Sequence, residues 1–199
     1  MRFLKYPVAF ALWFVWVVAS AGLVVYGRKL HRIERASALY WDGSTDGAIA
    51  AFRDLEQEFR RHSWLARLVS GDRDRVLHNY LRLLYLREDY DSVIVHGEAA
   101  LLDRDGAAPL VRYWLGNAYY RKAVSGEVEE EDALAWLRRA GEQYRAAVID
   151  ASGDWDVKYN HELVQTMLRK LDKQPPQRVF EVLRPQDKPS PRPPTRKIG

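Results

Sequence analysis

The hydrophobic pattern divides the chain into three parts. The first part contains a long uninterrupted apolar run. Residues 7–26 contain no charged side chain. About twenty residues in a helix, each rising about 1.5 Å, cross the roughly 30 Å hydrocarbon core of a bilayer. A core helix of a soluble protein is rarely apolar on every face. The run therefore predicts one transmembrane helix, in an N-terminal anchor of residues 1–30 that holds the chain in a membrane through residues 7–26.

The residues alone leave open whether this anchor is cleaved and on which side of the membrane the rest of the chain lies. Ala19, Ser20 and Ala21 resemble the small-residue site that a signal peptidase cleaves, and release after Ala21 would give a secreted carrier. The apolar run continues beyond Ala21 to Tyr26, which favours an anchor that is retained. Counting Lys and Arg on the two sides of the run slightly favours a cytoplasmic position for the rest of the chain.

Residues 31–172 show a helical period, with apolar side chains at i, i+3, i+4 and i+7 and short turns that contain Gly and Asp. The segment 115–120, Leu-Gly-Asn-Ala-Tyr-Tyr, resembles the first helix of a tetratricopeptide repeat. Gly116 would let a second helix approach closely. That second helix should place an aromatic residue between two alanines, and the matching residues are Ala140, Tyr144 and Ala147.

Two further copies of this helix pair lie upstream of it, and a single helix lies downstream. Residues 76–86 and 90–100 form one upstream pair, about 35 residues before the next, close to the usual repeat length. A weaker copy begins near Ile33, and its second helix carries Ala48, Phe52 and Leu55. Residues 155–171 resemble a lone first helix that caps the stack. The expected fold is all-α: a transmembrane helix followed by a short tetratricopeptide-like solenoid. The alternative is an irregular helical bundle.

The third part of the chain, residues 173–199, is rich in proline and in Lys and Arg. Proline interrupts both helices and central strands. We expect a disordered tail here.

The composition excludes several classes of function. A formal net charge of +4 is too small to indicate a nucleic-acid-binding protein, and there is no cysteine to form disulfides or thiolate metal sites. No two histidines have the i, i+3 or i+4 spacing of a helical metal site. The acidic segment 127–132 lacks the alternating ligands and the central glycine of an EF-hand. We therefore expect no metal, no cofactor and no enzymatic activity.

Segments 115–119 and 144–147 together with residues 154–163, Asp-Trp-Asp-Val-Lys-Tyr-Asn-His-Glu-Leu, resemble a bacterial family. Its members are membrane-anchored tetratricopeptide proteins encoded beside MoxR-type AAA+ ATPases and von Willebrand A-domain proteins, the MxaK-type proteins among them. The first repeat is weak and the tail has no counterpart in that family. The resemblance implies an accessory factor in the maturation, by metal insertion or assembly, of an enzyme complex such as methanol dehydrogenase. It also implies a single-pass protein of the bacterial inner membrane with a periplasmic domain, against the slight charge bias.

The resemblance further implies which residues line the concave surface of the repeats. These are Arg75, His78, Arg82, Tyr85, Tyr113, Asn117, Tyr120, Arg121 and Tyr159. Arginine beside tyrosine suits an extended acidic or C-terminal segment of a partner, because guanidinium groups bind carboxylates in a forked geometry. Alternatively, these residues form a helix face that is exposed to solvent and binds no partner. The expected partners are a von Willebrand A-domain membrane protein, a MoxR-type ATPase or the client enzyme.

The sequence thus predicts a membrane-anchored scaffold that binds other proteins. An alternative of a different class is a structural envelope protein whose repeat domain only associates with itself.

Overall fold

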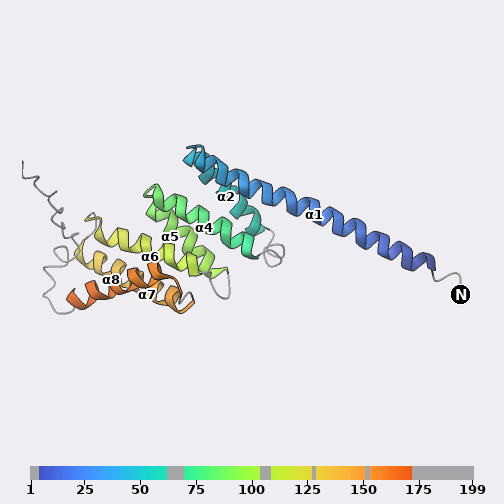
Figure 1. Cartoon of the computed structure of the whole chain (residues 1–199). Coiled ribbons are helices and arrows are strands. Elements are labelled where there is room, and N and C mark those ends of the chain that lie inside the picture. The colour runs from blue at the N-terminus through green and yellow to red at the C-terminus, as the bar shows by residue number, and fades with distance from the viewer. Residues whose placement is uncertain (1–4, 62–69, 104–108, 127–128, 151–152, 172–199) are drawn as a thin grey trace, which may run out of the picture. The chain divides into compact units, whose positions relative to one another are not determined.

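The computed structural model describes residues 5–61, 70–103, 109–126, 129–150 and 153–171, and all regular structure in these ranges is α-helical. The helices are α1 (Lys5–Trp41), α2 (Thr45–Arg61), α4 (Ser70–Leu86), α5 (Tyr90–Leu102), α6 (Pro109–Val124), α7 (Glu130–Asp150) and α8 (Trp155–Leu171) (Figure 1). The all-α prediction is confirmed. The chain divides into two compact units, Met1–Leu83 and Leu84–Gly199. The predicted tail, residues 173–199, lies outside the described residues.

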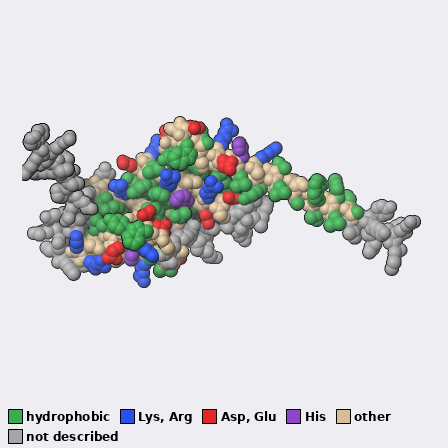
Figure 2. Space-filling view, in the orientation of Figure 1, with side chains coloured by type: hydrophobic (Ala, Val, Ile, Leu, Met, Phe, Trp, Pro, Cys, Tyr) green, Lys and Arg blue, Asp and Glu red, His purple; other side chains and the backbone are tan. Residues whose placement is uncertain are grey.

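Helix α1 contains the apolar run and continues without a break beyond it (Figure 1). Its apolar part, from Ala9 onward, is long and apolar enough to cross a membrane, and none of its most apolar stretch is buried inside the protein. Figure 2 shows hydrophobic side chains along this part of the helix. The helix predicted over residues 7–26 is therefore present. The predicted boundary between anchor and domain at residue 30 falls inside α1.

In the N-terminal unit, α1 and α2 form a helical hairpin. Gly43 in the turn has a φ of +84°, a conformation that glycine adopts without the strain that a Cβ would cause. The N–H of Ser44 donates to the carbonyl of Leu39 at 2.8 Å, which ends α1 in a Schellman motif. The residues expected on the second helix of this repeat are all buried in the structure: Ala48, Phe52 and Leu55.

Helix α4 ends in the same kind of motif, although its left-handed residue is not a glycine. Glu88 has a φ of 63°, and the N–H of Asp89 donates to the carbonyl of Leu84 at 3.0 Å. The carboxylate of Asp89 then accepts a hydrogen bond from the N–H of Ser92 at 3.1 Å and caps α5. The short turn between the predicted helices of this repeat therefore has a specific backbone geometry.

A glycine lies at the closest approach of each successive helix pair in the C-terminal unit. A Cβ built on Gly97 of α5 would lie 2.7 Å from the side chain of Leu115 on α6. A Cβ on Gly116 would lie 2.7 Å from the ring of Tyr144 on α7. Gly141 of α7 is less crowded, with atoms of α8 from 3.3 Å outward. The role predicted for Gly116 is confirmed, because only a residue without a Cβ admits the Tyr144 ring at this distance.

Candidate partner-binding site

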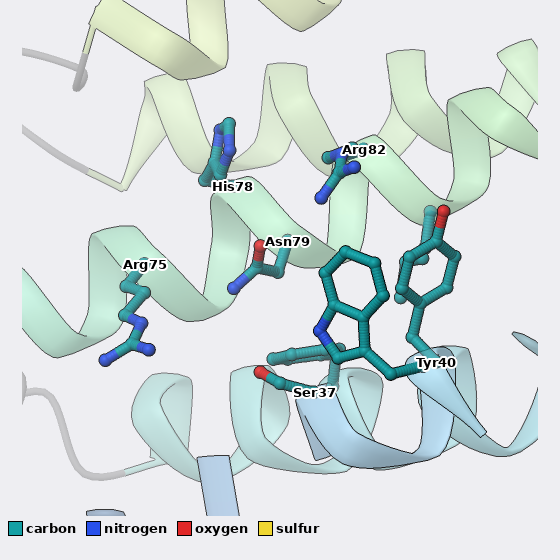
Figure 3. A pocket seen from close by; sticks show the side chains of 9 residues that line it. Ser37, Tyr40, Arg75, His78, Asn79 and Arg82 are labelled. Atoms are coloured by element: carbon teal, nitrogen blue, oxygen red, sulfur yellow. The ribbon is translucent and has the colours of Figure 1, made fainter. Parts of the chain in front are cut away.

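The first group of predicted binding residues lines a pocket in the N-terminal unit. The pocket has a volume of about 340 Å³ and lies between the C-terminal part of α1 and α4. Its lining consists of Ser37, Tyr40, Trp41, Phe52, Arg75, His78, Asn79, Arg82 and Leu83. Figure 3 shows Ser37 and Tyr40 on α1 and the labelled cationic and amide side chains on α4. The structure thus brings Arg75, His78 and Arg82 together at one cavity.

This pocket is cationic and aromatic, since none of its nine lining residues is acidic. The guanidinium carbon of Arg82 lies 5.6 Å from the centre of the Tyr40 ring, within the range of a cation–π contact. Burial lowers the pKa of His78, and the positive charge of Arg82 lowers it further, so that the imidazole is neutral at pH 7. Trp41 is 76% exposed at the pocket edge. Such a pocket can hold a carboxylate beside an apolar or aromatic group.

The second group lies in the C-terminal unit, where four predicted residues form what we call the tyrosine–arginine face: Tyr85, Tyr120, Arg121 and Tyr159. The Nε of Arg121 on α6 donates to the hydroxyl of Tyr85 at 3.0 Å. Burial raises the pKa of Tyr120, the charge of Arg121 opposes this, and the neighbouring Tyr85 and Tyr159 raise it again. Because Tyr159 remains 59% exposed, this face offers aromatic surface to solvent. Three helices, α4, α6 and α8, therefore contribute side chains to this face.

Of the two remaining predicted residues of α6, Asn117 is buried and Tyr113 is half-buried. Asn117 is only 7% exposed, and its Oδ1 accepts hydrogen bonds from the hydroxyl of Tyr144 and from Nδ2 of Asn160 at 3.1 Å. The half-buried ring of Tyr113 lies 6.4 Å from that of Tyr144. Asn117 therefore joins α6, α7 and α8, because a buried amide needs partners for its polar atoms.

The structure adds residues that the sequence analysis did not single out. Tyr40, Trp41 and Asn79 line the pocket, and the ring of Trp114 lies 5.4 Å from that of Tyr85. Tyr40 and Trp41 end the first helix of the weakest repeat, so their register was the least certain in the chain. Their signal was a pair of adjacent aromatic residues directly before a Gly-containing turn.

Among the described residues, no group of three or more His, Asp or Glu side chains is placed to hold a metal ion. The acidic segment 127–132 is described from residue 129 onward. It leads into α7, where the N–H of Ala133 donates to the carbonyl of Glu129 at 2.9 Å. Acidic residues are favoured at such a helix start because the helix dipole is positive there.

The chain was compared with protein-family models, with curated proteins and with solved structures, and none of the three comparisons finds a match.

Proposed function

We propose that this protein is a membrane-anchored adaptor that binds an acidic segment of another protein through the pocket between α1 and α4. The single observation that carries the proposal is the composition of this pocket: two arginines and a histidine, aromatic side chains, and no acidic lining residue. A cavity of about 340 Å³ is at the small end of the range for ligand sites, which suits one or two side chains of an extended segment.

The arrangement of the helices supports a tetratricopeptide-like solenoid as the scaffold. In the C-terminal unit the helix contacts are concentrated between neighbours in sequence, α5 with α6, α6 with α7 and α7 with α8. Contacts of this kind are typical of repeat proteins, in which each unit packs only on the next. The glycines at successive interfaces support the same interpretation.

In this proposal the protein is an accessory factor in the maturation of an enzyme complex such as methanol dehydrogenase, by metal insertion or assembly. Its partner is a von Willebrand A-domain membrane protein, a MoxR-type ATPase or the client enzyme. The basis is the resemblance of residues 115–163 to the MxaK-type family, and the cationic pocket is compatible with it. The protein itself holds no cofactor and performs no reaction.

We further propose that the protein is a single-pass protein of the bacterial inner membrane with its helical domain in the periplasm. The exposed apolar side chains of α1 support the membrane anchor. A fusion of alkaline phosphatase after Gly199 tests the orientation. Enzyme activity of the membrane-bound fusion is expected, and an inactive fusion would place the domain in the cytoplasm beside the ATPase.

A binding experiment tests the pocket. A fluorescent peptide rich in Asp and Glu is titrated with the full chain in detergent, and its anisotropy is measured. Replacing Arg75 and Arg82 by Gln should weaken binding by about tenfold or more, since a hydrogen bond to a charged group contributes about 1.5–3 kcal/mol. The matched control replaces the exposed Arg138 and Arg145 of α7 by Gln, with the same loss of charge.

Three results would contradict the proposal. Equal weakening in the pocket variant and the control would indicate non-specific attraction to a basic protein. If the peptide does not bind at all, an acidic segment is excluded as the ligand of the pocket. Concentration-dependent oligomers that persist in the pocket variant, together with absent peptide binding, would favour the self-associating envelope protein.

A further inference from the structure

Helix α1 carries a glycine where its apolar run meets the rest of the N-terminal unit. Gly27 follows Tyr26, the last residue of that run, and lies well inside the helix. A Cβ at Gly27 would meet no atom within 4 Å, so no close packing requires a glycine there. Glycine weakens a helix interior by up to about 1 kcal/mol relative to alanine. Without further contacts, Gly27 would be the natural point for α1 to bend.

Two contacts, one on each side of Gly27 in the sequence, hold α1 to the other helices of the unit. On one side, the hydroxyl of Tyr26 donates to Oδ2 of Asp72 near the start of α4, at 2.9 Å. On the other side, Nζ of Lys29 lies 3.3 Å from Oε1 of Glu58 near the end of α2. The same ammonium group lies 4.0 Å from the centre of the Phe59 ring.

The Lys29 contact is well shielded from solvent. Lys29 is only 5% exposed, and Glu58 also pairs with Arg32. Burial acts to raise the pKa of Glu58, but the hydrogen bond from Arg32 and the charge of Lys29 outweigh it and hold the pKa below its ordinary value. The carboxylate is therefore ionised at neutral pH. Both helix ends are thus attached to α1 within one turn of the end of the apolar run.

These contacts determine which end of the N-terminal unit faces a membrane that α1 crosses. The end of α2 and the start of α4 lie beside residues 26–29, whereas the hairpin turn at Gly43 lies roughly 25 Å further along α1. Arg61 follows Glu58 by three residues, or about 4.5 Å along α2. Arg28 and Arg61 are both exposed at this end.

Nearby carboxylates at this end are already engaged within the protein. Asp72 accepts from Tyr26, Glu58 pairs with Lys29, and Glu56 pairs with Arg60. We infer that Arg28 and Arg61 bind the phosphate groups of anionic lipids, with the end of α2 and the start of α4 resting on the membrane surface. This inference rests on the proposed membrane anchor. The partner is a lipid surface because a guanidinium at headgroup level meets phosphates in a fitting forked geometry.

The position of the unit is tested first, on the full chain reconstituted in phosphatidylcholine vesicles that contain a headgroup nitroxide lipid. Because the chain has no cysteine, one cysteine can be introduced and labelled without further changes. The exposed Gln57→Cys variant probes the membrane end of α2, and the exposed Asp42→Cys variant probes the far end of the hairpin. Bimane fluorescence at position 57 should be quenched strongly, and at position 42 weakly.

The lipid preference is tested next with spin-labelled phosphatidylglycerol and phosphatidylcholine. The full chain should prefer the anionic lipid, and the Arg28→Gln/Arg61→Gln variant should lose this preference, by up to roughly fivefold for each arginine. The matched control, Arg35→Gln/Arg53→Gln, removes two exposed arginines further from the apolar run and should retain it. High salt should weaken the preference of the unaltered chain, because it screens exposed charges.

The outcomes separate this inference from the anchor on which it depends. Protein that does not float with the vesicles in a density gradient would overturn the anchor itself. Protein that floats but is quenched equally at positions 57 and 42 would overturn the surface position of the unit. An unchanged lipid preference in the Arg28→Gln/Arg61→Gln variant would overturn the lipid contact.

Discussion

Replacing Gly116 by alanine tests whether the close approach of α6 and α7 determines the stability of the C-terminal unit. The new Cβ would lie 2.7, 2.8 and 3.0 Å from three ring carbons of Tyr144. This ring cannot move away easily, since it is 1% exposed and its hydroxyl donates to Asn117. Overpacking of a core lowers the free energy of unfolding by about 1–3 kcal/mol. The better helix propensity of alanine offsets up to about 1 kcal/mol of this loss. We expect a net loss of about 1–2 kcal/mol.

The matched control is the same substitution where space is open. A Cβ at Gly71, in the first turn of α4, would meet no atom within 4 Å. Gly71→Ala should therefore leave the free energy of unfolding unchanged or raise it by up to about 1 kcal/mol. Both variants are compared with the unaltered full chain in mild detergent by urea denaturation followed by circular dichroism. If Gly116→Ala is as stable as Gly71→Ala, the packing argument is refuted.

Two further predictions concern polar contacts between helices. Asn117→Ala should lower the free energy of unfolding by about 1–3 kcal/mol because it removes the buried acceptor of the Tyr144 hydroxyl, whereas Tyr144→Phe should cost only about 0.5–1.5 kcal/mol. Urea denaturation measures both, and equal stability of the two variants and the unaltered chain would contradict this role of Asn117. The second prediction concerns Glu58, whose folded-state pKa is held below its ordinary value of 4.5. The unfolded chain then binds more protons, so the stabilisation is present above about pH 4.5 and is lost as the pH falls through the folded-state pKa. Glu58→Gln should reduce this acid dependence of stability, and an identical pH profile in the variant would refute the assignment.

Much of the helical architecture could be predicted because it depends on local patterns. The apolar run, the 3.6-residue period and the turns containing Gly or Asp are each visible within a short window of sequence, and the structure has helices where they indicate them. The glycine of the α6–α7 interface was also predictable, since Gly116 and Tyr144 occupy related positions in a repeat. The solenoid superhelix and the binding role of the surface residues remain predictions.

The sequence by itself therefore determined the helix content, the apolar span of α1 and the helical pairing near Gly116. Only the tertiary structure decided that Asn117 is a buried link between helices, although the family resemblance implied that it lines the concave binding surface. The tertiary structure also decided that Tyr40 and Trp41 complete the cationic pocket. It likewise decided that Lys29 pairs with Glu58 beside the end of the apolar run. The physical reason is the same in each case. A helical period tells which side of its own helix a residue occupies, but the partner of a side chain depends on the rotation and depth at which another helix packs against it.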